Sequence, residues 1–439
     1  MKDDASYHPQ TGEKITVLDK HLSREKTEPL RQQYDVLGAE ALERLQAVRA
    51  AIAEDSGRAK GTPLPPDDLY SLLRDHHQDD DVLSQFWEET HTVPTWVDWE
   101  QLVRGQKVFY RYAIANIVGF ALQGFVAENS AAPGVIEVLV PLLGRLLETF
   151  QWLIQGHIAT VRVRLLHSSV RQRILKLCQT RPSYFDTAQF GIPVNTLDSI
   201  HSISVFSANP LWLQLPTFGI RPSKQECEDY VALFRYLAHV IGTPTSYFET
   251  ADKAKLTMES LIVHEVRTTE TSYVVLHNFM ECVGNLPPPF HVSKQFIEVG
   301  SRWISGNEFC DTLRLGKPRL LYYAAFLGHC ILVTGLAWIQ RLVPSIDEAV
   351  IKFFRRAMYE GVAQRKSRTR FEFKYVPQMG KSTGREKHVA DKKEVSGSKF
   401  TYGYFEMVLL SVTLGTGALL AGGLFVTWKA LKANLLAVK

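Results

Sequence analysis

Three residues that could bind a cofactor lie on one face of a helix predicted over residues 160–176 (TVRVRLLHSSVRQRILK). Arg164, His167 and Arg171 stand at positions i−3, i and i+4, and at 100° per residue they project within roughly a 100° arc. The segment has no glycine or proline, and its apolar residues recur with helical spacing. Imidazole ligates haem iron, and the rigid fork of arginine suits the two propionates. The pattern therefore suits a haem site with His167 on the iron and Arg164 and Arg171 on the propionates.

The three residues taken alone also fit a plainer interpretation. A histidine on a helix face is more often a core or surface residue than a metal ligand. Nucleic-acid binding by the arginines is disfavoured, because no aromatic residues alternate with them and the net charge is only +4 over 439 residues. The sequence contains no glycine-rich phosphate loop, zinc motif or GxSxG elbow that would offer another chemistry.

The elements that must position these residues are predicted to be helices. Between residues 69 and 360, long apolar-periodic segments alternate with Pro/Gly breaks, and β-hairpin signals are absent. An amphipathic helix is expected over 28–56, followed by a Pro- and Gly-rich linker at 57–68. We therefore expect an all-α fold, with a helical extension and linker at 1–68 and one large helical domain at 69–360.

Composition narrows the class of protein further. Hydrophobic residues make up 45% of the chain and charged residues 22%, which are ordinary values for a globular protein with a sizeable core. The five cysteines are scattered and form no CxxC pair, which argues against a disulfide framework and a zinc site and favours a reducing compartment. The N-terminal sequence MKDDASYHPQTGEK is polar and is not expected to be a signal peptide.

The C-terminal region is predicted to hold a membrane anchor at 401–428. From 404 to 428 the only charged residue is Glu406, and about 20 apolar residues suffice to span a bilayer. The stretch 365–399 has eleven lysines and arginines against four acidic residues, so we expect a flexible basic linker at 361–400 that contacts anionic lipid. The short tail 429–439 and the basic linker predict a tail anchor in the endoplasmic reticulum, with the main domain cytosolic. The alternative is a buried C-terminal core helix.

A second uncharged run complicates this prediction. Residues 320–340 lie between Arg319 and Arg341 and are long enough to span a bilayer. The run contains His329, which a buried helix beside an apolar pocket explains at least as well. The sequence leaves the two interpretations open.

Several motifs together resemble one protein family. The run Arg164-x-x-His167-x-x-x-Arg171 resembles the proximal haem motif of the family that joins bacterial rubber oxygenases (latex-clearing proteins) to the MpaB-type ER-bound oxygenases. RLLET at 145–149 is similar to the distal motif of the rubber oxygenases, with Arg145 and Thr149 in register, and His201 lies at the spacing of a second recurrent histidine. With the similar segments 93–112 and 229–244, the resemblance covers roughly residues 80–260.

The resemblance implies a globin-like haem-binding core, haem b, dioxygen as co-substrate and oxidative cleavage of a C=C bond in an apolar isoprenoid chain. It implies that Arg145 and Thr149 orient dioxygen or a distal water, and that Glu128 is the base for an allylic proton. Glu148, which replaces the lysine that can cap the iron in rubber oxygenases, is the competing base and places the chain nearer the MpaB type.

Other interpretations remain open beside the resemblance. Glu128 also fits a solvated helix end, and His201 either supports the haem site or is structural. The alternative function is a non-enzymatic, membrane-anchored helical protein that binds lipid or sterol. A haem protein that only peroxidises or senses is a third, and the oligomeric state is left open.

Overall fold

The computed structural model describes residues 5–7, 14–16, 22–55, 68–128, 156–268, 272, 273, 276, 280, 292–360 and 403–437. Within these ranges the regular structure is helical apart from one short antiparallel ribbon, β1 (Ala5–Tyr7) with β2 (Lys14–Thr16). The predicted all-α class is confirmed. The predicted linker at 57–68, except Asp68, and the basic stretch 365–399 lie outside the described residues.

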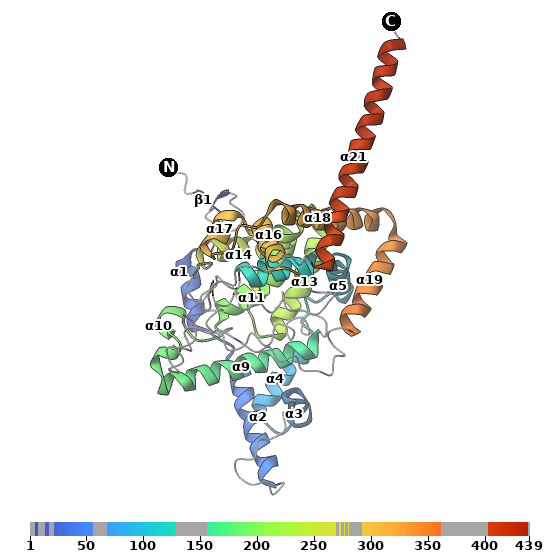
Figure 1. Cartoon of the computed structure of the whole chain (residues 1–439). Helices are drawn as coiled ribbons and strands as arrows, with labels where there is room; N and C mark the ends of the chain where they lie inside the picture. Colours follow the sequence, from blue (N-terminus) through green and yellow to red (C-terminus); the bar gives the residue numbers. More distant parts are fainter. Residues whose placement is uncertain are drawn as a thin grey trace.

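The helices follow one another along the chain in the order seen in Figure 1. The first half holds α1 (Arg24–Thr27), η1 (Glu28–Gln32), α2 (Val36–Asp55), α3 (Leu69–His76), α4 (Asp81–His91), α5 (Trp99–Arg111), α6 (Ala113–Gly119), η2 (Phe120–Glu128), α9 (His157–Thr180), η5 (Pro182–Tyr184), α10 (Thr187–Phe190), α11 (Thr196–Asn209) and η6 (Pro210–Gln214). The second half holds α12 (Leu215–Thr217), α13 (Lys224–Val240), η7 (Thr245–Phe248), α14 (Ala251–His264), α16 (Lys294–Ser305), α17 (Asn307–Thr312), α18 (Leu320–Leu342), α19 (Pro344–Met358) and α21 (Tyr404–Ala437).

The predicted helix at 28–56 begins later than the periodicity suggested, at Val36. Its first residues instead form a 3₁₀ turn opened by Pro29, and Gln33 is extended with φ −106° and ψ 147°. Tertiary contacts hold this break open, because the carbonyl of Gln33 accepts the amide of Thr196 at 2.8 Å and Asp35 pairs with Arg164. Local helix propensity yields here to partners from distant parts of the chain.

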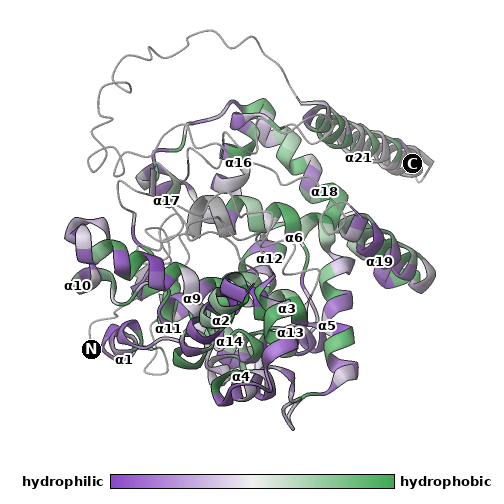
Figure 2. Ribbon diagram, turned by 90° about the horizontal axis from the view of Figure 1, so that it is seen from below, coloured by the Kyte–Doolittle hydropathy of each residue, from purple (hydrophilic) through white to green (hydrophobic). Residues whose placement is uncertain are grey.

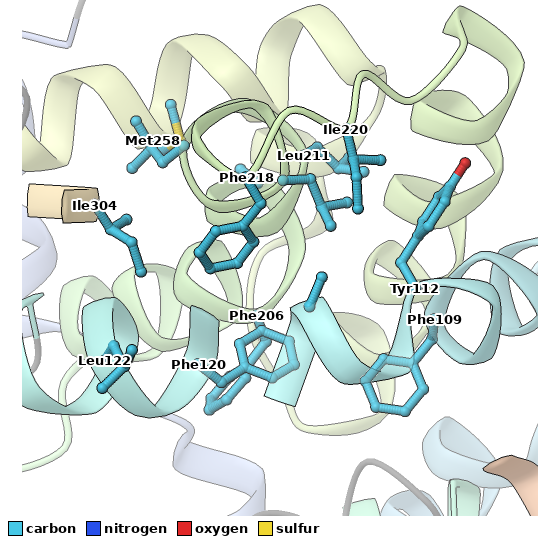
Figure 3. Packing of buried hydrophobic residues seen from close by; sticks show 14 of the residues in the cluster. Phe109, Tyr112, Phe120, Leu122, Phe206, Leu211, Phe218, Ile220, Met258 and Ile304 are labelled. Carbon is cyan, nitrogen blue, oxygen red and sulfur yellow. The ribbon is translucent and has the colours of Figure 1, made fainter. Parts of the chain in front are cut away.

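The main core surrounds α11, in which nearly every residue is buried. Its Phe206 packs against Phe120 of η2 with ring centroids 5.3 Å apart, and Figure 3 shows both rings among other apolar side chains of the cluster. A capping box between Asn195 and Asp198 starts the helix, so both side chains satisfy backbone amides at its first turn.

A second apolar cluster joins the N-terminal region to the site helix. Ala41 and Leu45 of α2 pack with Val161 and Leu165 of α9, and all four are fully buried. Residues 36–55 therefore share a core with α9.

Helix α21 projects far beyond the rest of the molecule (Figure 1). It includes the segment 404–428, which is helical as predicted, and large apolar residues along its outer part are exposed, with Leu419 at 79%. By length and composition α18 and α21 are both apolar enough to cross a membrane, and α18 is much the more buried of the two. In Figure 2 much of α18 is coloured as hydrophobic, whereas helices such as α4 and α5 mix hydrophilic and hydrophobic residues, as expected of amphipathic helices.

Candidate active site

Helix α9 presents its three predicted residues toward the short segment that leads into α2. Asp35 pairs with Arg164, and the guanidinium carbon of Arg171 lies 4.7 Å from the centroid of the Tyr34 ring. The charge of Asp35 also acts on His167. The structure therefore brings Arg164, His167 and Arg171 together against residues 34 and 35, which precede the predicted helical domain.

His167 is held as a neutral imidazole. Burial, with the nearby charge of Arg171, lowers its pKa to about 4, although Asp35 acts in the opposite direction. The residue is nevertheless only half-buried, so part of its surface remains accessible. A neutral, partly accessible imidazole is the form that can bind a metal.

Arg164 is 2% exposed and fully engaged with protein groups. Its Nε and Nη2 each donate to Asp35 at 2.8 Å, and Nη2 also lies 2.7 Å from Glu89. Burial opposes the charge, but the two carboxylates outweigh it and raise the pKa. Gly242, at φ +80°, makes room for this pair, because a Cβ there would lie 2.8 Å from the Nε of Arg164. The positive charge of Arg164 is therefore neutralised by carboxylates of the protein itself.

Arg171 is 4% exposed and is placed differently. It donates to backbone carbonyls only, from Nε to Pro193 at 3.2 Å and from Nη2 to Val194 at 2.9 Å. Its Nη1 is buried without a hydrogen-bond partner among the described residues, and within them Arg171 forms no ion pair. Burial lowers its pKa, even though Asp35, Tyr34 and Asp198 favour the charge. A buried cation with a free donor is costly unless a carboxylate binds it.

The loop that receives Arg171 is strained at Val194, whose φ of +55° is rare for a β-branched residue. Its carbonyl points to Arg171 in this conformation. Strained residues of this kind cluster at functional sites.

On α11, which follows this loop, His201 is buried and its pKa falls to about 4 because of burial and the nearby charge of Arg31. It is therefore neutral at pH 7. A supporting role of His201 in the haem site stays a prediction.

Asp198 is a residue that the sequence analysis missed. It is buried on the first turn of α11, and burial raises its pKa to about 7, with Arg31 and Arg171 acting against the rise. A buried carboxyl that titrates near neutral pH beside a cofactor-binding face is a candidate proton carrier. The capping position of Asp198 in NTLDSI suggested only a structural role.

The remaining predicted residues are not placed by the structure. Arg145, Glu148 and Thr149 lie outside the described residues, and Glu128 ends η2 without a described side chain. Among the described residues no group of three or more histidine, cysteine or acidic side chains could hold a metal ion. A haem iron requires only one or two protein ligands, so this observation does not bear on it.

A family model described as "ER-bound oxygenase mpaB/B'/Rubber oxygenase, catalytic domain" matches residues 107–332. The chain belongs to this family. The matched range contains α9, α11, α13 and most of α18, whereas Tyr34, Asp35 and α21 lie outside it. As a member of the mpaB/rubber oxygenase family, the protein is an oxygenase-type enzyme.

A solved structure supports the same fold. "Structure of Latex Clearing Protein LCP in the closed state" superposes with a TM-score of 0.52 at 18% identity, over 80% of this chain and 94% of that chain. No curated protein sequence matches the chain. At this identity the likeness concerns the fold, and the substrate and cofactor must be argued from the site.

Proposed function

We propose that the protein is a haem b-dependent oxygenase that cleaves or oxidises a C=C bond of an apolar isoprenoid or terpenoid chain with dioxygen. The observation that supports this best is the buried Nη1 of Arg171, which has no hydrogen-bond partner among the described residues and lies on the same helix face as a neutral His167. A ligand that brings both a metal and a carboxylate would satisfy the two groups at once, and haem b is such a ligand.

The sequence predicted that both Arg164 and Arg171 bind propionates, but their surroundings suit them to two different roles. Arg171 would donate Nη1 to a propionate, while Arg164, already paired with Asp35 and Glu89, positions α9 against the chain that leads into α2. His167 would hold the iron from the proximal side. Haem, when bound, supplies the iron chemistry that activates dioxygen.

Several groups are candidates for handling protons and oxygen on the substrate side. Arg145 and Thr149 remain proposed donors to dioxygen or a distal water, and Glu128 and Glu148 remain proposed bases. Asp198 joins them, because a carboxyl with a pKa of about 7 exchanges protons readily at neutral pH. His201 would supply a fixed neutral ring behind the site.

The anchor is part of the proposal. Exposed apolar residues along the outer part of α21 favour insertion in a bilayer, and the family description, with its ER-bound members, favours the endoplasmic reticulum. The basic stretch 365–399 before α21 favours a cytosolic position of the main domain.

The test is the haem content of the full-length chain purified in detergent. We expect a Soret band and one b-type haem per chain, and loss of most of the haem in His167→Ala. The matched control is His157→Ala, on the same helix α9, whose Nδ1 bonds to the Tyr236 hydroxyl at 3.1 Å. This control should keep its haem.

The outcomes separate the candidate functions. A colourless protein that still binds lipid would support the non-enzymatic alternative. A red protein should form aldehyde or ketone ends from farnesyl- or geranylgeranyl-type chains in oxygen but not under nitrogen. A red protein without such products would leave only a sensing or peroxidising role. An unchanged Soret band in His167→Ala would show that His167 is not the iron ligand.

A further inference from the structure

Helix α18 has an apolar stripe on the surface of the molecule, much of which is exposed. Its exposed large apolar residues lie within an arc of about 140° at 100° per residue, so they share one helix face. They are Leu320, Leu321, Leu327, Leu332, Trp338, Ile339 and Leu342. A stripe of this length on a surface helix marks a binding surface.

The base of α21 crosses this same stripe. Gly328 lies midway along it, and a Cβ there would overlap the backbone carbonyl of Leu409. Next to this contact, Thr413 Oγ1 donates to the carbonyl of Ala324 at 2.6 Å. From Leu414 onward the large apolar residues of α21 are mostly exposed. Figure 1 shows α21 projecting, beside α18, from the remainder of the molecule, which we call the body. A bilayer entered by α21 would therefore meet the stripe on α18 at the point of entry.

The charges along the chain that contains the stripe are basic, as suits an anionic lipid surface. Between Asp311 and Asp347 the chain has no acidic residue, but it has four basic ones, at 314, 317, 319 and 341. Two of these, Arg319 and Arg341, flank the two ends of the apolar run, and Arg341, which lies 3.9 Å from Glu226, is 36% exposed. Basic residues beside apolar side chains are typical of helices that lie in a membrane interface.

The buried face of α18 favours this arrangement over one in which the helix spans the bilayer. Thr334 Oγ1 donates to the carbonyl of Phe218 at 2.6 Å, and Gln340 Nε2 donates to Asp347 at 3.0 Å. His329 is fully buried beside the rings of Phe218 and Phe326. A spanning α18 would lose these contacts with the body, whereas an interfacial α18 keeps them.

We propose that the exposed stripe of α18 is seated in the headgroup–acyl boundary of the bilayer that α21 crosses. The inference rests on the proposed anchoring by α21 and commits to lipid, not a protein partner, as the occupant. Residues 320–340 would then be neither a second membrane span nor a fully buried helix, but a helix at the membrane interface. The body is then held against the membrane, so an apolar isoprenoid chain dissolved in the bilayer reaches it without crossing water.

The experiment uses tryptophan quenching by brominated acyl chains in the full-length protein, reconstituted in vesicles of mixed phosphatidylcholine and phosphatidylserine. Trp338 on the stripe is 58% exposed, and Trp99 at the start of α5 is a matched control at 53%. Trp99 is remote from the stripe. It stands at the first position of α5, whereas the last residue of α5, Arg111, contacts Asp347 of α19, the helix that follows α18. Trp428 reports on α21.

We expect the fluorescence quenched by brominated lipid to decrease in both Trp338→Phe and Trp428→Phe and to stay unchanged in Trp99→Phe. A decrease only in Trp428→Phe would overturn the inference while the anchor stands. No decrease in either would overturn both. If Trp338 were shielded from brominated lipid and from aqueous acrylamide alike, a protein surface would cover the stripe, and the inference would again be wrong.

Discussion

Arg164 and Arg171 share a helix face, yet their surroundings assign them different tasks. Arg164 is neutralised by Asp35 and Glu89, whereas Arg171 reaches two carbonyls and keeps one buried donor free among the described residues. A buried charge without a counter-ion is retained where a ligand supplies one, or where it serves another function. The contrast leads to two separate predictions.

Arg171→Met is expected to weaken haem binding roughly 10- to 150-fold, because one hydrogen bond to a charged group contributes about 1.5–3 kcal/mol. Haem titration followed at the Soret band measures this. Arg173→Met, at an exposed position on the same helix, is the control and should bind haem normally. Equal affinities of the two variants would remove Arg171 from the propionate site.

Arg164→Met should instead destabilise the fold by about 3–5 kcal/mol, since it leaves the carboxylate of Asp35 without its buried partner. Chemical denaturation in detergent, compared with Arg173→Met, measures the loss. A variant that unfolds normally but loses haem would reassign Arg164 to the cofactor.

Asp198 predicts a pH dependence of stability. Burial raises the pKa of the Asp198 carboxyl from its ordinary value of 3.8 to about 7 in the folded protein. Its protonated form therefore stabilises the fold below about pH 4, and this contribution is lost as the pH rises to about 7. His167 and His201 have lowered pKa values, so their contribution to the stability of the fold is lost as the pH falls from 6.5 to about 4. The informative quantity is therefore the difference between Asp198→Asn and wild type.

We expect Asp198→Asn to be no more stable than wild type at pH 4 and more stable at pH 8, measured as the free energy of unfolding. The asparagine keeps an oxygen that can cap Asn195 N. A difference that does not change with pH would show that Asp198 does not titrate near neutral pH.

At the scale of elements, the site depends on helices that are far apart in the sequence. The segment before α2 covers the face of α9, and α18 receives the base of α21. In both places a residue without a side chain permits the approach, Gly242 beside the Arg164–Asp35 pair and Gly328 beside Leu409. Close approach of this kind is sensitive to a single methyl group.

Gly328→Ala should displace the base of α21, because the added Cβ would meet a backbone carbonyl that cannot rotate away. We expect faster proteolysis between the body and α21 and a loss of stability. Gly335→Ala on the same helix is the matched control, since nothing lies within 4 Å of its Cβ, and it should stabilise α18 by about 0.5–1 kcal/mol. Similar behaviour of the two variants would contradict the α18–α21 contact.

At the scale of the whole molecule, the exposed stripe on α18 and the projecting α21 underlie the proposal that the enzyme works at a membrane surface. The family assignment covers residues 107–332, and α21 lies outside this range. The proposed anchor is therefore separate in sequence from the matched catalytic domain.

The proposed orientation predicts that, in sealed microsomes, external protease digests the body while α21 stays protected by lipid. Immunoblots with an N-terminal epitope and mass spectrometry of the protected peptide measure this. Digestion after detergent treatment is the control. Protection of the N-terminal epitope in sealed vesicles would place the body in the lumen.

Local periodicity was sufficient to predict the helix that bears His167, the all-α class and the helix at 404–428, because helical spacing and apolar runs are written in neighbouring residues. It was not sufficient to find where α2 begins, which of two similar arginines is paired, or that Asp198 titrates near neutral pH. These depend on partners far away in the sequence, such as Asp35, 129 positions before Arg164, and on the burial that those partners create. Charge and hydrogen bonding inside a protein are set by which groups the fold brings within a few ångströms, and only the tertiary structure decides that.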